Sequence, residues 1–257
     1  MRIRLLRHAT LLINAAGTEL IVDPLLGAAE AYVPIRNSPN PRRNPLVELP
    51  VDEESLEAIL AGVQAVMVTH LHSDHWDEAA KEKLDKGLPI FCQPSDTTTI
   101  EEAGFMQVLP MGASEVWEGI QISITGGRHG SGELAERLGP VSGFVIRVEG
   151  QPSLYIAGDT VWCPEVEEAL EKHRPDLVVV NAGAARFVDS DRITMDADDV
   201  SHVAQAAPSA QIVAMHMEAI NHCLLTREEL RKALEQRGLS NRIWIPEDGE
   251  TREFQLG

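Results

Sequence analysis

Three histidines and one aspartate fall within six residues of the chain, and this segment constrains the protein more than any other feature of the sequence. It reads Val66-Met-Val-Thr-His70-Leu-His72-Ser-Asp74-His75-Trp76. In an extended segment His70 and His72 point to the same side, because side chains alternate with a period of two. A helix that begins near Trp76 lets Asp74 and His75 face back toward the same place. Imidazole nitrogen and carboxylate oxygen are the usual ligands of zinc, manganese and iron, so the segment predicts a metal site.

The composition excludes several classes of protein. The chain has 257 residues, of which 44% are hydrophobic and 24% charged, the balance of an ordinary globular protein. No apolar run reaches the roughly 18 residues that a membrane span needs. The net charge of −18 repels phosphate backbones, and the sequence contains no basic stripe. We therefore expect no membrane span and no nucleic-acid partner.

Cysteine usage and the first residues indicate the compartment. Cys92, Cys163 and Cys223 are too few and too scattered for a disulfide framework, and no Cys-x-x-Cys motif occurs. The chain starts with basic residues, but Arg7 and His8 interrupt the apolar stretch that a signal peptide would need. We expect a cytoplasmic protein.

The hydrophobic pattern predicts an α/β fold. Apolar, β-branched runs predict strands at 3–6, 10–14, 19–22, 63–69, 88–92, 120–125, 143–148, 153–157, 176–180, 211–215 and 242–245. Apolar residues at helical spacing predict helices at 53–61, 77–86, 96–103, 164–173, 196–206 and 226–237. Strands come first as hairpins and then alternate with helices, and the second half repeats this order. This pattern predicts two packed mixed sheets with helices outside, in a single domain over residues 1–257.

One long stretch between these elements has no regular pattern. Residues 27–50 contain five prolines, which exclude a long helix or a central strand there. A loop of this length in a compact domain is typical of a binding loop or lid, and a packed surface loop is an equal alternative.

Three further ligand-type residues follow predicted strands. His129 comes after the strand at 120–125, Asp159 after 153–157 and His216 after 211–215. In α/β sheets, functional groups gather where the carboxyl ends of strands meet at one edge. We therefore expect these side chains near the histidine-rich segment.

The order of these residues resembles the metallo-β-lactamase superfamily, whose hallmark is His-x-His-x-Asp-His followed by separate His, Asp and His ligands. More narrowly, the chain is similar to the branch that contains ascorbate-6-phosphate lactonase-like proteins and N-acyl-phosphatidylethanolamine phospholipase D. The narrower resemblance rests on His8-Ala-Thr10, Ile21-Val-Asp23-Pro24, Arg128-His129, Gly143-Phe144 and Gly158-Asp159-Thr160. It implies a four-layer αββα sandwich. Many relatives have a histidine where this chain has Thr194, before Met195.

The resemblance also implies a dinuclear metal centre. In that arrangement His70, His72 and His129 hold one divalent ion, while Asp74, His75 and His216 hold the second and Asp159 bridges the two. Zinc is the first choice of metal, with manganese and iron as alternatives. A hydroxide that bridges the metals would attack an ester, lactone, amide or phosphodiester of a small anionic substrate. Asp74 or Asp159 would take up a proton, which makes the protein a hydrolase of lactonase or phosphodiesterase type.

Four more residues have weaker claims to the site. His8 and Asp23 match signature positions and would orient metal-bound histidines, although packing at strand ends is an equal alternative. Arg128 would contact an anionic group of the substrate or form a structural ion pair. His222, six residues after His216, would reach the pocket or serve as an ordinary core or surface histidine.

Two other functions remain open on the same residues. One is a mononuclear-iron oxidoreductase, since related folds use a similar His/His/Asp set for oxygen chemistry. The other is a metal-binding protein without catalytic activity. A small-molecule substrate is the expected partner, and a homo-oligomer is left open.

Overall fold

The computed structural model describes residues 1–256, which form two seven-stranded sheets packed face to face. The first sheet has the order β14-β1-β2-β3-β4-β5-β6. Its strands are β1 (Arg2–Arg7), β2 (Thr10–Ala15), β3 (Thr18–Val22), β4 (Ala65–Met67), β5 (Pro89–Cys92), β6 (Gln107–Pro110) and β14 (Thr251–Glu253). Pairing is antiparallel from β14 to β3 and parallel from β3 to β6, so the sheet is mixed.

The second sheet repeats this plan with the order β13-β12-β11-β10-β9-β8-β7. Its strands are β7 (Ser114–Trp117), β8 (Ile120–Gly126), β9 (Ser142–Arg147), β10 (Leu154–Ile156), β11 (Leu177–Asn181), β12 (Gln211–Met215) and β13 (Ile243–Trp244). The strands from β7 to β10 pair antiparallel, and those from β10 to β13 pair parallel. The carboxyl ends of β8, β10 and β12 therefore lie at the same edge.

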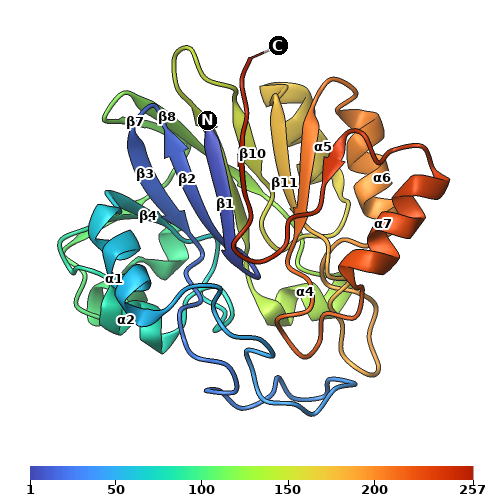
Figure 1. The fold of residues 1–257 in the computed structure, drawn as a ribbon, viewed down its shortest axis with the longest axis horizontal. Coiled ribbons are helices and arrows are strands. Elements are labelled where there is room, and N and C mark those ends of the chain that lie inside the picture. Colours follow the sequence, from blue (N-terminus) through green and yellow to red (C-terminus); the bar gives the residue numbers. More distant parts are fainter. Residues whose placement is uncertain (257) are drawn as a thin grey trace.

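Helices cover the outer faces of both sheets (Figure 1). The first sheet packs against α1 (Glu53–Gly62), α2 (Glu78–Lys83) and α3 (Thr97–Glu102), the last preceded by a short 3-10 turn at Pro94–Asp96. The second sheet packs against α5 (Pro164–His173), α6 (Ala197–Ala206) and α7 (Arg227–Gln236). The short α4 (Gly132–Leu138) lies at the lower edge of the sandwich in this view. The predicted four-layer αββα sandwich is confirmed.

Strand alternation divides the core into layers. In β12, Val213 and Met215 pack into the cluster between the two sheets, whereas Ile212 and Ala214 pack against the outer helices. This period of two is the one expected for a strand buried on both faces. It brings the chain to the edge of the sheet with His216 as the next residue.

Every predicted strand and helix is present, and four elements were missed. The sequence did not indicate β6, β7, β14 or α4. Strands β6, β7 and β14 lie at or next to the ends of their sheets and have mostly exposed residues, so they lack a clear apolar alternation. Helix α4 contains no fully buried residue and therefore has no apolar stripe. None of the helices among residues 1–256 has the length and apolar character required to cross a membrane.

The proline-rich stretch 27–50 is joined to the body of the protein by hydrogen bonds (Figure 1, the blue loop at the bottom). The buried guanidinium of Arg7 donates to the backbone carbonyl groups of Leu25, Gly27 and Val47 at 2.7–3.0 Å. These bonds satisfy carbonyl groups at both ends of the stretch, which identifies a packed loop rather than a free one.

Asp77 fixes the start of the same loop. Its Oδ2 atom accepts from the backbone N–H groups of Leu26 and Gly27 at 3.0 and 2.7 Å, and from the hydroxyl of Tyr32 at 3.0 Å. Its Oδ1 atom accepts from the N–H of Ala80 at 2.7 Å and so caps α2. One buried carboxylate therefore joins a helix start to the loop.

We expect Asp77→Ala to destabilise the protein by about 2–4 kcal/mol, because it removes a helix cap and leaves buried N–H groups without an acceptor. Urea unfolding measures this loss. The matched control is Asp52→Ala, at the exposed cap of α1, where the carboxylate accepts from Ser55 only. The control should lose much less stability, and equal losses in both variants would contradict the role of Asp77.

Candidate metal centre

The ligand-type residues that the sequence singles out lie together at one edge of the sandwich. One segment, after β4, contributes His70, His72, Asp74 and His75. Single residues after β8, β10 and β12 contribute His129, Asp159 and His216. Their ligand atoms, with those of His8, form three groups whose members lie within 4.8 Å of one another: His70/His72/His129, His8/Asp74/His75/His216 and His70/His75/Asp159.

Hydrogen bonds fix the orientation of the first group. The Nδ1–H of His129 donates to the carbonyl oxygen of Ile193 at 2.8 Å, which leaves Nε2 free for a metal. The Nε2 atom of His72 lies 3.2 Å from the carbonyl oxygen of Leu138, so Nδ1 is its free nitrogen. Backbone carbonyl groups from two distant segments therefore set the imidazole tautomers.

The tautomer of His70 follows from its neighbours. The hydroxyl of Thr69 donates to Asp23 Oδ2 at 2.7 Å, so this hydroxyl accepts from the Nδ1–H of His70 at 3.0 Å. The Nε2 atom of His70 then carries a lone pair, and it is buried without a hydrogen-bond partner among residues 1–256. A buried lone pair of this kind fits a metal ligand.

Asp23 also fixes the third histidine of the motif. Its Oδ2 atom accepts from the Nδ1–H of His75 at 2.9 Å, and its Oδ1 atom accepts from the backbone N–H of Thr69 at 2.8 Å. Asp23 is itself buried. One carboxylate thus orients His75 directly and His70 through Thr69, the kind of contact that positions metal-bound imidazoles.

The second group faces the first across a short distance. The Nε2 atoms of His75 and His216 lie 3.2 Å apart, and Asp74 Oδ2 lies 3.9 Å from each of them. Because the Nδ1–H of His75 donates to Asp23, its Nε2 atom is the nitrogen that faces His216. A cation held by both rings would stabilise this arrangement.

Asp159 lies between the two groups. Its Oδ2 atom is 3.3 Å from His75 Nε2 and 3.6 Å from His129 Nε2, and its Oδ1 atom is 3.2 Å from His216 Nε2. The amide of Asn181 donates to Oδ1 at 2.6 Å and holds the carboxylate in place. Asn181 was not predicted as a site residue; its signal in the sequence is a polar residue at the end of the otherwise apolar strand β11.

The electrostatics of the cluster favour added positive charge. Burial alone would raise the pKa of Asp159, but the imidazoles of His216, His75 and His129 hold it well below its usual value. Burial would likewise lower the pKa of His75, but the carboxylates of Asp159, Asp23 and Asp74 raise it well above its usual value. Buried carboxylates surrounded by imidazole nitrogens are a donor set that fits divalent metal ions.

His8 supports the cluster as a neutral ring. Burial lowers its pKa to about 4, and its Nε2 atom lies 3.2 Å from Asp74 Oδ2. Its Nδ1 atom has no partner among the described residues. A buried N–H without an acceptor costs more than an unpaired lone pair. The proton therefore belongs on Nε2, where it is donated to Asp74.

Three residues in or next to the cluster have a left-handed backbone, which residues other than glycine rarely adopt. Their φ angles are 61° at His8, 45° at Asp23 and 71° at His216. The backbone N–H of His216 donates to the carbonyl oxygen of His8 at 3.1 Å and so connects two of these positions across the sheets. Such conformations cost free energy and cluster at functional sites.

The two remaining candidates differ in position. His222 is buried, and burial lowers its pKa to about 4, while the carboxylates of Asp74 and Asp159 act to raise it. The Sγ atom of the next residue, Cys223, lies 3.5 Å from His216 Nδ1, so this segment runs beside the cluster. Arg128 is exposed and donates to Glu165 at 2.9 Å, so the structure places it in a surface ion pair.

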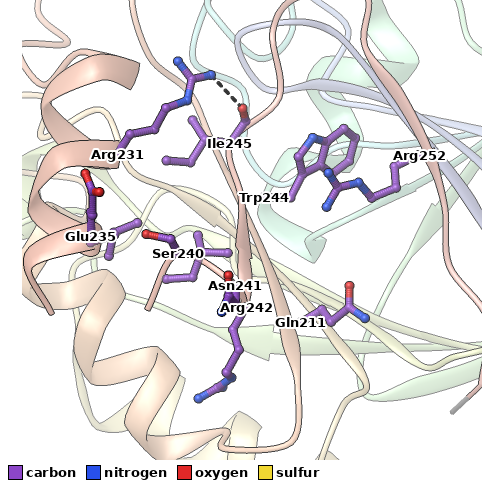
Figure 2. A pocket seen from close by; sticks show the side chains of 11 residues that line it. Gln211, Arg231, Glu235, Ser240, Asn241, Arg242, Trp244, Ile245 and Arg252 are labelled. Atoms are coloured by element: carbon purple, nitrogen blue, oxygen red, sulfur yellow. Dashed lines mark hydrogen bonds between the residues drawn. The ribbon is translucent and has the colours of Figure 1, made fainter. Parts of the chain in front are cut away.

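A cavity of about 590 Å³ lies elsewhere, between α7 and β13 (Figure 2). None of the residues that line it belongs to the histidine-rich cluster. In Figure 2 the side chain of Arg231 points to the carbonyl oxygen of Ile245, to which it donates at 3.0 Å. Volume alone therefore does not locate the candidate site.

Comparisons with known proteins identify the family of the chain. A family described as "Beta-lactamase superfamily domain" matches residues 2–216. The chain is 39% identical to the UPF0173 protein YddR of Bacillus subtilis (strain 168), over 99% of this chain and 100% of the relative. It is 25% identical to a UPF0173 metal-dependent hydrolase of Azorhizobium caulinodans, over 98% of this chain and 100% of that protein.

A solved structure has nearly the same fold. It is the crystal structure of isothiocyanate hydrolase from Delia radicum gut bacteria, with a TM-score of 0.94 and 39% sequence identity. The match covers 100% of both chains.

We expect Asp23→Asn to lower the affinity for divalent metal by about 10- to 100-fold, because an amide cannot accept all three hydrogen bonds that orient His70 and His75. Competition with a chelator of known affinity measures this change. Asp52→Asn, an exposed substitution far from the cluster, should leave the affinity unchanged. Wild-type affinity in Asp23→Asn would contradict the orienting role.

Proposed function

The chain belongs to the metallo-β-lactamase superfamily, and within it to the UPF0173 metal-dependent hydrolases. We therefore propose that the protein binds two divalent metal ions and uses them to hydrolyse a small substrate. One observation carries this proposal. The carboxylate of Asp159 lies between two sets of imidazole nitrogens, each close enough to share an ion with it. Metal-dependent hydrolysis itself, without a stated substrate or number of ions, is a property of the family.

The proposed ligand sets divide the cluster. His70, His72 and His129 hold one ion through the nitrogens that their hydrogen bonds leave free. Asp74, His75 and His216 hold the other, and Asp159 contacts both. Zinc is the first choice, and manganese and iron suit the same mixture of nitrogen and oxygen ligands.

Bound divalent ions lower the pKa of water toward neutrality and polarise a carbonyl or phosphoryl oxygen. The protein supplies the place for the proton. Asp159 Oδ1 accepts from Asn181, and Asp159 Oδ2 faces two imidazoles. Asp74 Oδ2 accepts from His8, whereas Asp74 Oδ1 has no hydrogen bond among residues 1–256. We therefore assign proton uptake to Asp74 Oδ1.

The substrate class follows from the chemistry of the site. Esters, lactones, amides and phosphodiesters all present an electrophilic carbon or phosphorus with an oxygen that a cationic site stabilises. The likeness of signature residues to ascorbate-6-phosphate lactonase-like proteins and N-acyl-phosphatidylethanolamine phospholipase D supports lactones and phosphodiesters within this set.

A second candidate reaction is the hydrolysis of isothiocyanates. It is favoured by the 39% identity, over the full length of both chains, to the isothiocyanate hydrolase from Delia radicum gut bacteria. Water adds to the central carbon of the N=C=S group, and the resulting thiocarbamate breaks its C–N bond. The products are an amine and carbonyl sulfide, so that the atoms balance with one water consumed.

The test is a panel of phosphorylated lactones, phosphodiesters, carboxylic esters and isothiocyanates, assayed with metal-loaded protein. We expect turnover of at least one class, loss of that activity on chelation, and its return with zinc or manganese. His72→Ala and Asp159→Ala should lose bound metal and reduce kcat/KM by about 10²–10³-fold or more, with unchanged circular dichroism.

Asp52→Ala is the control and should keep full activity. Unchanged metal content in both ligand variants would overturn the ligand assignment. One iron per chain with thiol-dependent oxygen uptake would support the oxidoreductase instead. A metal-loaded protein that is inactive across the panel would support a binding protein without catalysis.

A further inference from the structure

A cavity of about 530 Å³ opens between the proline-rich loop, α4 and the loop after β11. We call it the mouth pocket. Its lining residues are Ile35, Arg36, Asn37, Leu134, Arg137, Phe187, Asp189 and Ser190. Apolar side chains from all three segments form its walls, and charged side chains accompany them.

The segments that wall the mouth pocket also hold the histidine-rich cluster. Helix α4 contributes Arg137 to the pocket, and the next residue, Leu138, provides the carbonyl oxygen next to His72. The loop after β11 contributes Phe187 to the pocket and, further along, the carbonyl oxygen of Ile193 that accepts from His129. Both contacts connect the pocket to the first ligand group.

Two aromatic rings complete the connection. The ring of Phe187 stacks on that of His222, with centroids 6.2 Å apart and an angle of 19° between the planes. His222 is buried, and the residue after it, Cys223, contacts the ring of His216 with Sγ 3.5 Å from Nδ1. Phe187 therefore connects the pocket to the segment that follows His216.

The neighbouring Asn221 joins the third wall to this region. Its side-chain amide accepts from the backbone N–H of Ile35 and donates to the carbonyl oxygen of Ile35, both at 3.2 Å. The side-chain amide of Asn44 donates to Asn221 Oδ1 at 2.8 Å, and the backbone N–H of Asn221 donates to Asn44 Oδ1 at 2.9 Å. The wall that includes Ile35 and Arg36 is thus held in place by the residue before His222.

The two arginines of the pocket have no partner among the residues that the structure describes. Arg36 and Arg137 are exposed, and neither forms an ion pair or a side-chain hydrogen bond among residues 1–256. In contrast, Arg128 pairs with Glu165 and Arg192 pairs with Asp199. In a chain with a net charge of −18, two unpaired guanidinium groups beside one cavity are available to a ligand.

We propose that the mouth pocket binds the substrate, and that Arg36 and Arg137 bind an anionic group, a carboxylate or phosphate, at the end of an apolar body that packs on Phe187. The inference rests on the proposed hydrolase and names its substrate class. Guanidinium groups match the geometry of carboxylate and phosphate oxygens, and an aromatic wall suits an apolar or aromatic body. The exposed carboxylate of Asp189 lies in the same wall and opposes the anion.

The cavity between α7 and β13 does not offer the same features (Figure 2). Arg242 donates there to three carbonyl groups in the last turn of α6 and just after it, and Arg231 pairs with Glu247. The guanidinium of Arg252 lies over the ring of Trp244, 4.6 Å from its centroid. The arginines at that cavity are therefore already used within the protein.

The test compares two pairs of compounds that differ only by a carboxylate. They are 4-(butyryloxy)benzoate with phenyl butyrate, and 4-carboxyphenyl isothiocyanate with phenyl isothiocyanate. For the pair that the wild type hydrolyses, we expect a higher kcat/KM with the carboxylated compound. Arg137→Gln and Arg36→Gln should each lower that value about three- to tenfold, mainly through KM, and leave the neutral compound unchanged. Asp189→Asn should raise kcat/KM for the carboxylated compound about two- to threefold, because it removes one exposed negative charge that repels the carboxylate.

Arg174→Gln is the matched control, because it removes the same charge from an exposed arginine in the turn between α5 and β11, at the opposite edge from the cluster. It should change neither value. Equal losses for the charged and neutral compounds, or no preference for the carboxylate in the wild type, would overturn the proposal.

If the wild-type protein hydrolyses neither pair, this result counts against the proposed reaction. A binding measurement then tests the mouth pocket independently of catalysis. Calorimetry with 4-phenylbutyrate and metal-loaded protein should show binding that Arg137→Gln weakens about three- to tenfold. Equal binding by wild type and variant would overturn the proposal.

Discussion

The candidate centre depends on one buried carboxylate, that of Asp23. The backbone N–H of Asp23 donates to Met67 at 3.0 Å, so the pairing of β3 with β4 places this residue beside the start of the histidine-rich segment. From there it accepts three hydrogen bonds, two from Thr69 and one from His75. These bonds set which nitrogen of His70 and His75 is free. The ligand geometry therefore follows from a sheet register.

The cluster also joins the two halves of the sandwich. Each proposed ligand set combines residues that follow β4 of the first sheet with a histidine that follows a strand of the second sheet, His129 or His216. Ions bound by both halves would connect the sheets at an edge where several residues have strained backbone. Because metal binding adds to folding free energy, the cations would stabilise the arrangement that positions them.

Much of the fold and part of the site could be predicted from the sequence. Strand periodicity gave the two mixed sheets, and the spacing of His70, His72 and Asp74 indicated a metal site. The contacts that orient the histidines could not be predicted, because the carbonyl oxygens of Leu138 and Ile193 are backbone atoms that every residue has. Asn181 was missed because a single polar residue at a strand end is common. Edge strands such as β6 and the exposed helix α4 have no apolar face that a pattern can detect.

The central claim is that two metal ions share Asp159. Anomalous diffraction from crystals of protein purified without chelators tests it directly, with data collected at the absorption edges of zinc, manganese and iron. We expect two peaks, one against His70, His72 and His129 and one against Asp74, His75 and His216, with Asp159 contacting both. A single peak, or density for a metal that Asp159 does not contact, would contradict it.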